Sequence, residues 1–441
     1  MVRRLYALLL WLLAPAILLF TLWRAWRRPP YRDRWWQRFG WLPSRKDSPL
    51  WIHAVSVGET VAALPLVRAL RQHHPDIPVL LTTTTPTGAA IVAQRLGQDV
   101  SHVYLPYDLP FAVRRFLRRQ HPRLGLLMET ELWPNLLHEA GIRKIPMLLL
   151  NGRLSARSLR GYARWRMLFA PALQGLALVA AQTPGDAEGF RELGAAQVVL
   201  LGQIKLDIEV GESVYRQGHS WRHLFGARRV WVFASTHEGE ESLAAAVLVS
   251  LRQRHPDLLL VLAPRHPERG NAVAGLLQDR GFSCCRRSGG MVPGPDTDVF
   301  VVDSLGELMD FYAAADVVTI GGSFVARGGH NPIEPAALGR PIIVGPHMEN
   351  FRDLCFQMRE AGALIQTQDA TGLEHWLETF LEQEQMRTST GQRALQWLAG
   401  QQGALQRTLD RIEKWLPLTD SGIPPGDGEP ETSGGDAADP R

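Results

Sequence analysis

The sequence predicts an α/β protein with two Rossmann-like domains that face each other across a cleft, preceded by an apolar helix. Two observations lead to this prediction. Short apolar runs alternate with helical stretches at the spacing of βαβ units, first over residues 51–202 and again over residues 230–344. Between the two series, residues 210–223 show no sustained apolar period and are expected to connect the domains.

The expected boundaries are residues 1–28 for the apolar helix, 29–215 for the first domain, 216–416 for the second domain and 417–441 for a tail. The tail is rich in Pro, Gly and Asp and has little to bury, so it is predicted to be disordered. Helical stretches rich in Gln, Leu and Arg precede it. The chain is expected to return there to pack on the first domain.

The formal net charge of +4 conceals a strong asymmetry along the chain. Residues 1–46 carry a balance of +9, residues 420–441 carry −5, and the rest sums to zero. A nucleic-acid-binding protein would carry its positive excess on the folded core, so a nucleic acid partner is disfavoured. The adjacent Cys284 and Cys285 show no zinc spacing and cannot easily bridge each other, so a reduced compartment and inert thiols are expected.

Residues 5–23 form an uncharged apolar run of 19 residues, close to the length that spans the hydrocarbon core of a bilayer. No small residues typical of a cleavage site follow it, so an uncleaved membrane anchor is predicted rather than a signal peptide. The heavier positive flank is the C-terminal one, which places the domains on the cytoplasmic side. Pro15 lies midway along the run, so a shallow or re-entrant insertion is an alternative to a full span.

Carboxylates follow two of the predicted strands of the first domain. Glu59 comes directly after the first strand, and Glu129 and Glu131 come after the fourth. Functional residues of parallel sheets gather beyond the carboxyl ends of the strands. Each acid could instead be a first-turn helix residue that only complements the helix dipole. Lys205 follows the seventh strand and could equally be a solvated loop lysine.

Three strand ends of the second domain carry groups typical of a nucleotide site. Ser235 and Thr236 lie just before a helix and could contact phosphate. The planar guanidinium of Arg265, aimed into the cleft at a strand end, suits a phosphate or a carboxylate. The loop 303–308 offers backbone groups where a flat base could lie. No GxGxxG, P-loop or metal-ligand pattern is present, which disfavours dinucleotide enzymes and P-loop ATPases and predicts no metal site.

The stretch 316–351 is organised as strand, glycine loop, helix and strand. Asn331 is a good N-cap and Pro332 fits the first helical position, which puts Glu334 in the first turn. Such a helix end attracts phosphate, and a nearby carboxylate can accept hydrogen bonds from a ribose diol. A preceding glycine pair would let the backbone approach a ligand closely. The alternative is an ordinary strand–helix junction.

Several long motifs occur in a fixed order along the chain. They are HAVSVGET at 53–60, METELWPN at 128–135, NGRLSARS at 151–158, LGQIKLD at 201–207, STHEGEE at 235–241, APRHPER at 263–269 and GGHNPIEPAA at 328–337. On these motifs the chain resembles the 3-deoxy-D-manno-octulosonic acid (Kdo) transferases of lipopolysaccharide synthesis. The resemblance covers about residues 1–415.

This resemblance implies a GT-B glycosyltransferase fold, CMP-Kdo as the donor, and a lipid A precursor (lipid IVA) as the acceptor at the inner membrane. It implies no cofactor. It makes Glu59 the general base on the acceptor hydroxyl, and Glu129 and Lys205 charge-stabilising groups. The first domain becomes the acceptor side and the second the nucleotide-sugar side. The donor's CMP is expected on Pro264, Arg265, Leu305, Gly306, Glu307, Asn331, Pro332, Ile333 and Glu334.

The residue pattern agrees with these implications. One phosphate could be neutralised by a helix N-terminus and Arg265 without a metal. A carboxylate across the cleft could serve as base, and attack opposite the departing CMP would invert the anomeric carbon. The segment Gly202-Gln203-Ile204 departs from the pattern expected of the family before Lys205.

Other functions fit parts of the pattern. A GT-B enzyme with another donor, such as a UDP-sugar, would be separated by whether CMP or UDP protects the protein from thermal unfolding. A membrane-anchored binding protein with an inactive transferase fold would be expected to lack the carboxylate at 59 or the arginine at 265. A scaffold organised by the Trp-rich helices is a third alternative. The number of Kdo units transferred stays open.

Overall fold

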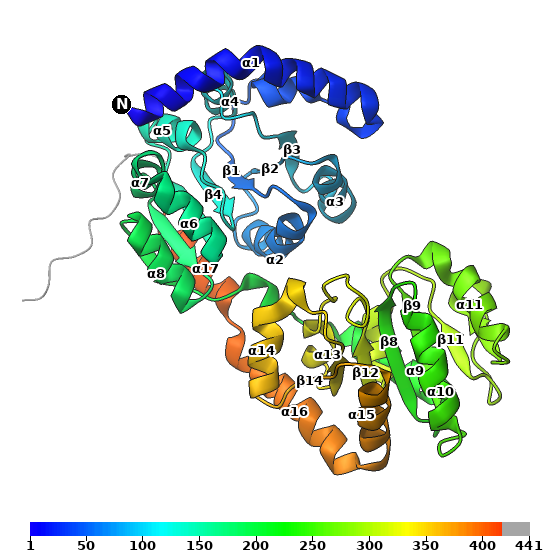
Figure 1. Cartoon of the computed structure of the whole chain (residues 1–441). Coiled ribbons are helices and arrows are strands. Elements are labelled where there is room, and N and C mark those ends of the chain that lie inside the picture. The colour runs from blue at the N-terminus through cyan, green and yellow to red at the C-terminus, as the bar shows by residue number, and fades with distance from the viewer. Residues whose placement is uncertain (417–441) are drawn as a thin grey trace, which may run out of the picture. The chain divides into compact units, whose positions relative to one another are not determined.

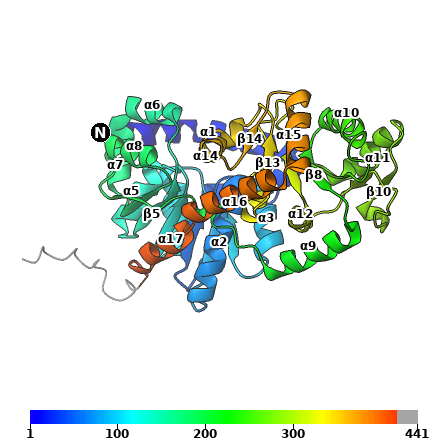
Figure 2. The same ribbon diagram turned by 90° about the horizontal axis from the view of Figure 1, so that it is seen from below.

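The computed structural model describes residues 1–416 and divides into two compact units (Figures 1 and 2). Unit 1 comprises Met1–Ile204 and the chain from Gly403 onward, and unit 2 comprises Lys205–Gln402. Each unit contains a seven-stranded sheet whose strand pairings are all parallel. The predicted α/β class with two doubly wound halves is confirmed. The expected tail, residues 417–441, lies outside the described residues.

The sheet of unit 1 has the strand order β3-β2-β1-β4-β5-β6-β7. The chain starts in the middle at β1, proceeds outward to β3, and returns to β4 on the other side of β1. The strand order therefore reverses between β1 and β4. The strands are β1 (Leu50–His53), β2 (Val79–Thr83), β3 (Ser101–Tyr104), β4 (Leu124–Met128), β5 (Met147–Gly152), β6 (Leu178–Ala181) and β7 (Val198–Leu200).

Helices connect these strands and cover both faces of the sheet. Buried strands of this kind are apolar along their whole length, because both of their faces are covered. In β1, Ile52 packs into the core on one face, while Trp51 packs on the other face against Phe116 at a ring-centroid distance of 5.0 Å. The helices are α2 (Val57–His73), α3 (Pro86–Leu96), α4 (Pro110–Gln120), α5 (Pro134–Ile142), α6 (Ala156–Arg164), α7 (Arg166–Gln174) and α8 (Pro184–Leu193).

The last described helix, α17 (Ala404–Glu413), belongs to unit 1 rather than to unit 2. Its Leu409 and Ile412 are buried in the same core cluster as Leu66 of α2. The expected return of the chain to the first domain is therefore confirmed for α17. The expected domain limits differ in two places, because residues 205–215 lie with unit 2 and residues 403–416 lie with unit 1.

The N-terminal helix α1 (Val2–Arg27) runs without a break through Pro15. One side of the helix packs on unit 1, where Leu10, Ala14, Ile17 and Leu18 contact the cluster of Phe39, Leu109 and Ala112. The Tyr6 hydroxyl donates to Asp108 at 3.1 Å, and Arg3 donates to Asn135 at 3.2 Å. Among the described residues, α1 is the one helix long and apolar enough to cross a membrane. Short 3-10 turns at Pro29–Tyr31 and Trp35–Phe39 follow it.

The sheet of unit 2 has the strand order β10-β11-β9-β8-β12-β13-β14, and its order reverses between β8 and β12. The strands are β8 (Val230–Thr236), β9 (Leu259–Pro264), β10 (Cys284–Arg286), β11 (Val299–Val301), β12 (Val317–Ile320), β13 (Ile342–Val344) and β14 (Ile365–Gln366). The helices are α9 (Glu212–Phe225), α10 (Glu240–Arg252), α11 (Gly270–Gln278), α12 (Leu308–Ala314), α13 (Ile333–Ala337), α14 (Arg352–Glu360), α15 (Ala370–Glu382) and α16 (Glu384–Gln401).

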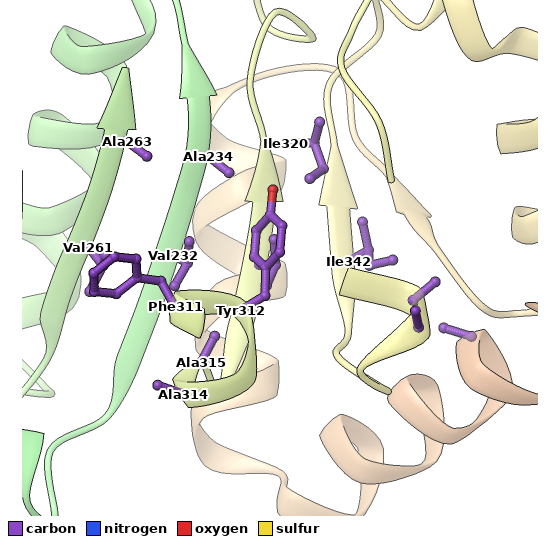
Figure 3. Close-up of a cluster of buried hydrophobic side chains, with 14 of the residues drawn as sticks. Val232, Ala234, Val261, Ala263, Phe311, Tyr312, Ala314, Ala315, Ile320 and Ile342 are labelled. Atoms are coloured by element: carbon purple, nitrogen blue, oxygen red, sulfur yellow. The ribbon is translucent and has the colours of Figure 1, made fainter. Parts of the chain in front are cut away.

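One face of this sheet packs against α12. Val232, Val261 and Ile320 point from three neighbouring strands toward Phe311 and Tyr312 of that helix (Figure 3). All three cysteines are free, as expected, and burial raises the pKa of the Cys284 and Cys355 thiols to about 12. The reactive thiolate is therefore scarce at neutral pH.

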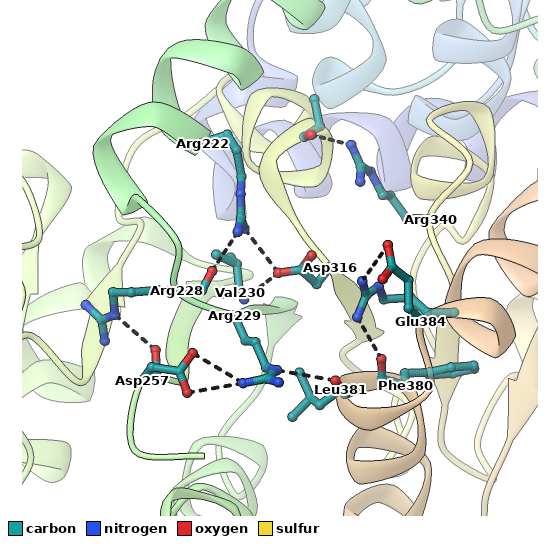
Figure 4. A network of polar contacts seen from close by, with 12 residues as sticks. Arg222, Arg228, Arg229, Val230, Asp257, Asp316, Arg340, Phe380, Leu381 and Glu384 are labelled. Carbon is teal, nitrogen blue, oxygen red and sulfur yellow. Dashed lines mark hydrogen bonds and ion pairs between the residues drawn. The ribbon is translucent and has the colours of Figure 1, made fainter.

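Ion pairs and hydrogen bonds tie together the amino ends of the unit 2 strands (Figure 4). Asp316, just before β12, accepts hydrogen bonds from the Val230 backbone at 2.8 Å and from Arg222 of α9 at 3.1 Å. Arg229 pairs with Asp257 at 3.4 Å. These charged groups are paired with one another and with backbone groups at the amino ends of the strands.

We expect Ile412→Ala to lower the free energy of unfolding of unit 1 by about 2–5 kcal/mol, because it removes buried methyl groups and leaves a cavity between α17 and the sheet. Urea unfolding followed by tryptophan fluorescence measures this change. Gln406→Ala, on the exposed side of the same helix, is the control and should change stability by less than about 0.5 kcal/mol. Equal stability of the two variants would contradict the packing of α17 on unit 1.

Candidate active site

Glu59 lies in the first turn of α2, directly beyond β1 at the point where the strand order of unit 1 reverses. Its carboxylate accepts from the Val55 backbone N–H at 2.8 Å and from the Ser56 hydroxyl at 2.9 Å. Ser56 caps the helix by accepting from the Glu59 N–H. The side chain thus has the helix-capping role that the sequence left as an alternative, and the same bonds hold it in one orientation at the crevice.

Glu129 and Glu131 follow β4, the neighbour of β1 across the reversal point. These acids lie near Glu59, since the charge of Glu129 acts on Glu59 and the charges of Glu59 and Glu129 both act on Glu131. Burial raises the pKa of the Glu59 carboxyl above its ordinary value, hydrogen bonds from Val55 and Ser56 oppose the rise, and the charge of Glu129 adds to it. A residue exposed to 8 % thus keeps a carboxylate of increased basicity.

Burial and the charge of Glu59 raise the pKa of Glu131 to about 7, against a hydrogen bond that the Trp133 indole N–H donates to it at 2.7 Å. The backbone of Glu129 is left-handed, with φ of 59°. A non-glycine residue pays for that conformation in steric energy, and such residues cluster at functional sites. Asn151 after β5 and Ser235 at the end of β8 are left-handed as well, with φ of 52° and 58°.

Lys205 lies in the 3-10 turn Ile204–Leu206, just after β7, and its side chain is exposed. It is the first residue of unit 2, whereas Glu59, Glu129 and Glu131 belong to unit 1. The structure therefore groups the three acids within unit 1.

The residues predicted to hold a nucleotide follow neighbouring strands of the unit 2 sheet, which run in the order β11-β9-β8-β12. Because these strands are parallel, their carboxyl ends meet at one edge of the sheet. The segments Pro264-Arg265, Leu305–Glu307 and Asn331–Glu334 follow β9, β11 and β12 in turn. The side chain of Arg265 is exposed, and Leu305 is exposed to 80 %.

The helix that contains Glu334 begins one residue later than expected, at Ile333, and it has only five residues. Asn331 still satisfies its first N–H, since its side-chain oxygen accepts from Ile333 at 3.0 Å. The Asn331 amide also donates to Glu334 at 3.3 Å. Burial raises the pKa of the Glu334 carboxyl, and the Asn331 bond opposes the rise. Asn331 thus fixes both the helix start and the carboxylate.

The carboxylate of Glu307 forms an ion pair and is not free to accept hydrogen bonds from a ligand. Its carboxylate accepts three hydrogen bonds from Arg287, at 2.6, 3.1 and 3.2 Å, and a further one from the Ser304 hydroxyl. The pair holds the Leu305-Gly306 turn, where Gly306 has a φ of 88° that favours glycine. The backbone of this turn, rather than the Glu307 side chain, is therefore presented at the edge of the sheet.

A fully buried carboxylate organises the loops around β8 and β12. Glu240, at the first position of α10, accepts backbone N–H groups from His237 at 2.8 Å, Gly322 at 2.8 Å, Ser323 at 3.1 Å and Phe324 at 2.9 Å. Gly321 lies so close to Ser235 that a Cβ atom on it would approach the Ser235 carbonyl oxygen to 2.5 Å. Gly321 therefore permits the close approach of β12 to β8 in the same sheet.

Two features of this edge were not predicted from the sequence. Glu240 lies inside the motif HEGEE, where three acids within four residues give no indication of which one is buried. His237 and His330 form a hydrogen-bonded pair with their Nε2 atoms 2.9 Å apart. The histidines of the STHEGEE and GGHNPIE motifs are a signal that could have suggested it, because both follow strands that flank the reversal point.

Within residues 1–416, one group of side chains could hold a metal ion, namely His255, Glu378 and Glu382. It lies at the end of α15 and beyond α10, away from the carboxyl ends of the strands. Arg254 already pairs with Glu378 at 2.7 Å. We assign this group no part in the site.

The two parallel sheets give the chain the GT-B fold. The solved structure of MurG from Acinetobacter baumannii aligns with a TM-score of 0.53 at 14% identity, over 83% of this chain and 99% of that one. UDP-GlcNAc 2-epimerase from Neisseria meningitidis aligns with a TM-score of 0.55 at 13% identity, over 83% of this chain and 100% of that one. At these identities the likeness concerns the fold alone.

Sequence comparison identifies the family. The family model described as 3-deoxy-D-manno-octulosonic-acid transferase (Kdo transferase) matches residues 33–208. The 3-deoxy-D-manno-octulosonic acid transferase of Haemophilus influenzae is 39% identical over 421 residues, which cover 94% of this chain and 99% of that protein. The enzyme of the same name from Bordetella pertussis is 42% identical over 432 residues, with the same coverage. The chain belongs to the Kdo transferase family and is a glycosyltransferase.

We expect the raised pKa of Glu131 to reduce stability as pH rises. Between about pH 4.5 and 7 the unfolded chain loses the Glu131 proton while the folded protein keeps it, so the free energy of unfolding falls across this window. Glu131→Gln should remove the penalty and stabilise the protein by about 1–3 kcal/mol at pH 8, with little effect at pH 4.5. Thermal unfolding of both proteins at the two pH values tests this, and an equal change at both would contradict it.

Proposed function

We propose that the protein transfers Kdo from CMP-Kdo to a hydroxyl group of a lipid A precursor, lipid IVA, with inversion at the anomeric carbon. The observation that carries the proposal is the position of Glu59. It is a carboxylate of raised pKa, held by two hydrogen bonds at the reversal point of the sheet, in a member of the Kdo transferase family. A general base needs this combination of fixed orientation and increased basicity.

In the proposed reaction, Glu59 accepts the proton of the acceptor hydroxyl as the oxygen forms its bond to the anomeric carbon of Kdo. The bond from that carbon to the phosphate oxygen breaks, and CMP leaves with the electron pair. Attack opposite the leaving group inverts the configuration. Glu129 assists because its negative charge helps to raise the pKa of Glu59.

The donor is proposed to bind at the carboxyl edge of the unit 2 sheet. Arg265 is exposed at the end of β9 and offers a planar cation for the single phosphate. Leu305 and Gly306 offer an exposed apolar side chain and open backbone for the base. The half-buried carboxylate of Glu334, fixed by Asn331, is positioned for a ribose diol. Pro264, Pro332 and Ile333 are buried and shape the backbone of these segments, while Lys205 is proposed to stabilise negative charge.

The exposed side of α1 is proposed to bind the cytoplasmic face of the inner membrane. The side of the helix turned away from unit 1 is apolar, while the packed side is held by Tyr6 and Arg3. A helix that is docked along its own domain is suited to lie in the headgroup region, with its apolar side in the lipid. The exposed apolar residues are Leu5, Leu8, Leu9, Trp11, Leu12, Leu13, Leu19, Phe20, Leu22, Trp23 and Trp26.

We expect Glu59→Gln to lower the rate of Kdo transfer by about 10²–10⁴-fold, because the amide cannot accept the hydroxyl proton. The measurement is transfer from CMP-Kdo to lipid IVA, with the anomeric configuration of the product determined by NMR. Binding of CMP should be unchanged in the variant, since Glu59 lies in the other unit. Absence of transfer by the wild type would refute the proposed function, whereas full activity of the variant or a retained configuration would refute the role of Glu59 alone.

We expect the double variant Leu12→Glu and Leu19→Glu to reduce binding to anionic lipid vesicles by at least about tenfold, because each charge is costly to insert among acyl chains. The two leucines are exposed to 72 % and 67 %, so the fold should persist. Vesicle flotation measures the bound fraction. Met291→Glu, exposed to 50 % in unit 2, is the control and should bind as the wild type does. Flotation of the double variant at the wild-type level would exclude this face of α1.

A further inference from the structure

His237 and His330 form a stacked pair at the reversal point of the unit 2 sheet. Their rings lie 5.1 Å apart between centroids, with an interplanar angle of 11°. Their Nε2 atoms are 2.9 Å apart, which is the distance of a hydrogen bond with one proton between two nitrogens. His237 follows β8 and His330 follows β12, so the two strands that flank the reversal point each supply one ring.

The shared proton determines what the pair offers to a ligand. Two neutral imidazoles carry two protons on four nitrogens, and one of these protons lies between the Nε2 atoms. One Nδ1 atom is then a donor and the other an acceptor. A third proton turns both Nδ1 atoms into donors and gives the pair a positive charge. The protonated pair is therefore a better partner for an anion than the neutral pair.

The surroundings keep the pair neutral when no ligand is bound. Burial, together with the neighbouring His237, Arg265 and His266, lowers the pKa of His330 to about 4. Burial also lowers the pKa of His237, and so do Arg327, His266, Arg265 and Arg269. The acid packed against the pair is Glu240, whose carboxylate already accepts four backbone N–H groups, including that of His237.

We propose that the His237–His330 pair binds the phosphate of the donor and takes up a proton as the phosphate arrives. The inference rests on the proposed function, because it takes CMP-Kdo as the ligand of this edge. Arg265 and His266 follow β9 and lie next to the pair, so an anion there would meet the Arg265 guanidinium, the His266 ring and the pair together. Such an anion favours the singly protonated, positively charged pair, which the empty site disfavours.

Calorimetric titration of the full chain with CMP tests the proposal, at pH 6 and 7 in buffers of different ionisation enthalpy. The dependence of the measured heat on the buffer gives the number of protons taken up. Because the phosphate of CMP itself titrates near pH 6, the decisive quantity is the difference between the wild type and its variants. Cytidine, which lacks the phosphate, should bind without proton uptake by the pair.

We expect His330→Gln and His237→Gln each to reduce proton uptake and to weaken CMP binding at pH 6 by about 10–100-fold, with a smaller effect at pH 8. His219→Gln, on the exposed surface of α9, is the matched control and should resemble the wild type. Because both histidines are substituted separately, the test of the pair stands even if one of the two variants fails to fold.

The outcomes separate the inference from the function beneath it. A wild type that does not bind CMP would overturn both the proposed donor and the role of the pair. CMP binding with unchanged proton uptake in both variants, or with the same loss of affinity in the variants at pH 6 and 8, would overturn the role of the pair and leave the donor assignment standing. Proton uptake with cytidine would show that the phosphate is not its cause.

Discussion

The site in unit 2 depends on the carboxylate of Glu240. It is 0 % exposed, yet four backbone N–H groups from two separate loops point at it. Burial raises the pKa of this carboxyl and the four hydrogen bonds oppose the rise. Without the carboxylate, the N–H groups of Gly322, Ser323 and Phe324 would be buried without a partner, at a cost of about 1–3 kcal/mol each. Glu240 therefore holds the loop after β12 against the loop after β8, and with it the position of both histidines.

In unit 1, different residues fix the loops at the point where the strand order reverses. Where a parallel sheet reverses its strand order, a crevice forms outside the carboxyl ends of the two central strands. The loops that follow these two strands then need contacts of their own to hold them in place. Here the first-turn Glu59 reaches back to Val55 and Ser56, so the group proposed to act as base is also a structural group of its own helix. The same contacts that stabilise the turn orient the carboxylate.

Much of this arrangement could be predicted from the sequence. The alternating apolar runs indicated both sheets, and the strand ends indicated where polar groups would gather, because parallel strands end at a common edge. The pairing of Glu307 with Arg287, the burial of Glu240 and the stacking of His237 on His330 could not be predicted, since each joins segments that are neighbours only after folding. The family resemblance supplied the identities of donor and acceptor, which neither periodicity nor composition contains. The helix start at Ile333 was displaced by one residue because Asn331 caps through its i+2 neighbour.

The return of α17 to unit 1 has a consequence for biosynthesis. Unit 2 is inserted into unit 1, with the chain crossing from one to the other at residues 204–205 and again at 402–403. A ribosome releases residues in order, so the core between α2 and the sheet stays incomplete until nearly the whole chain has emerged. Unit 2 is synthesised as one uninterrupted stretch and can form its sheet earlier. Unit 2 is thus expected to fold first, whereas unit 1, which carries the apolar helix, completes its core only after α17 has emerged.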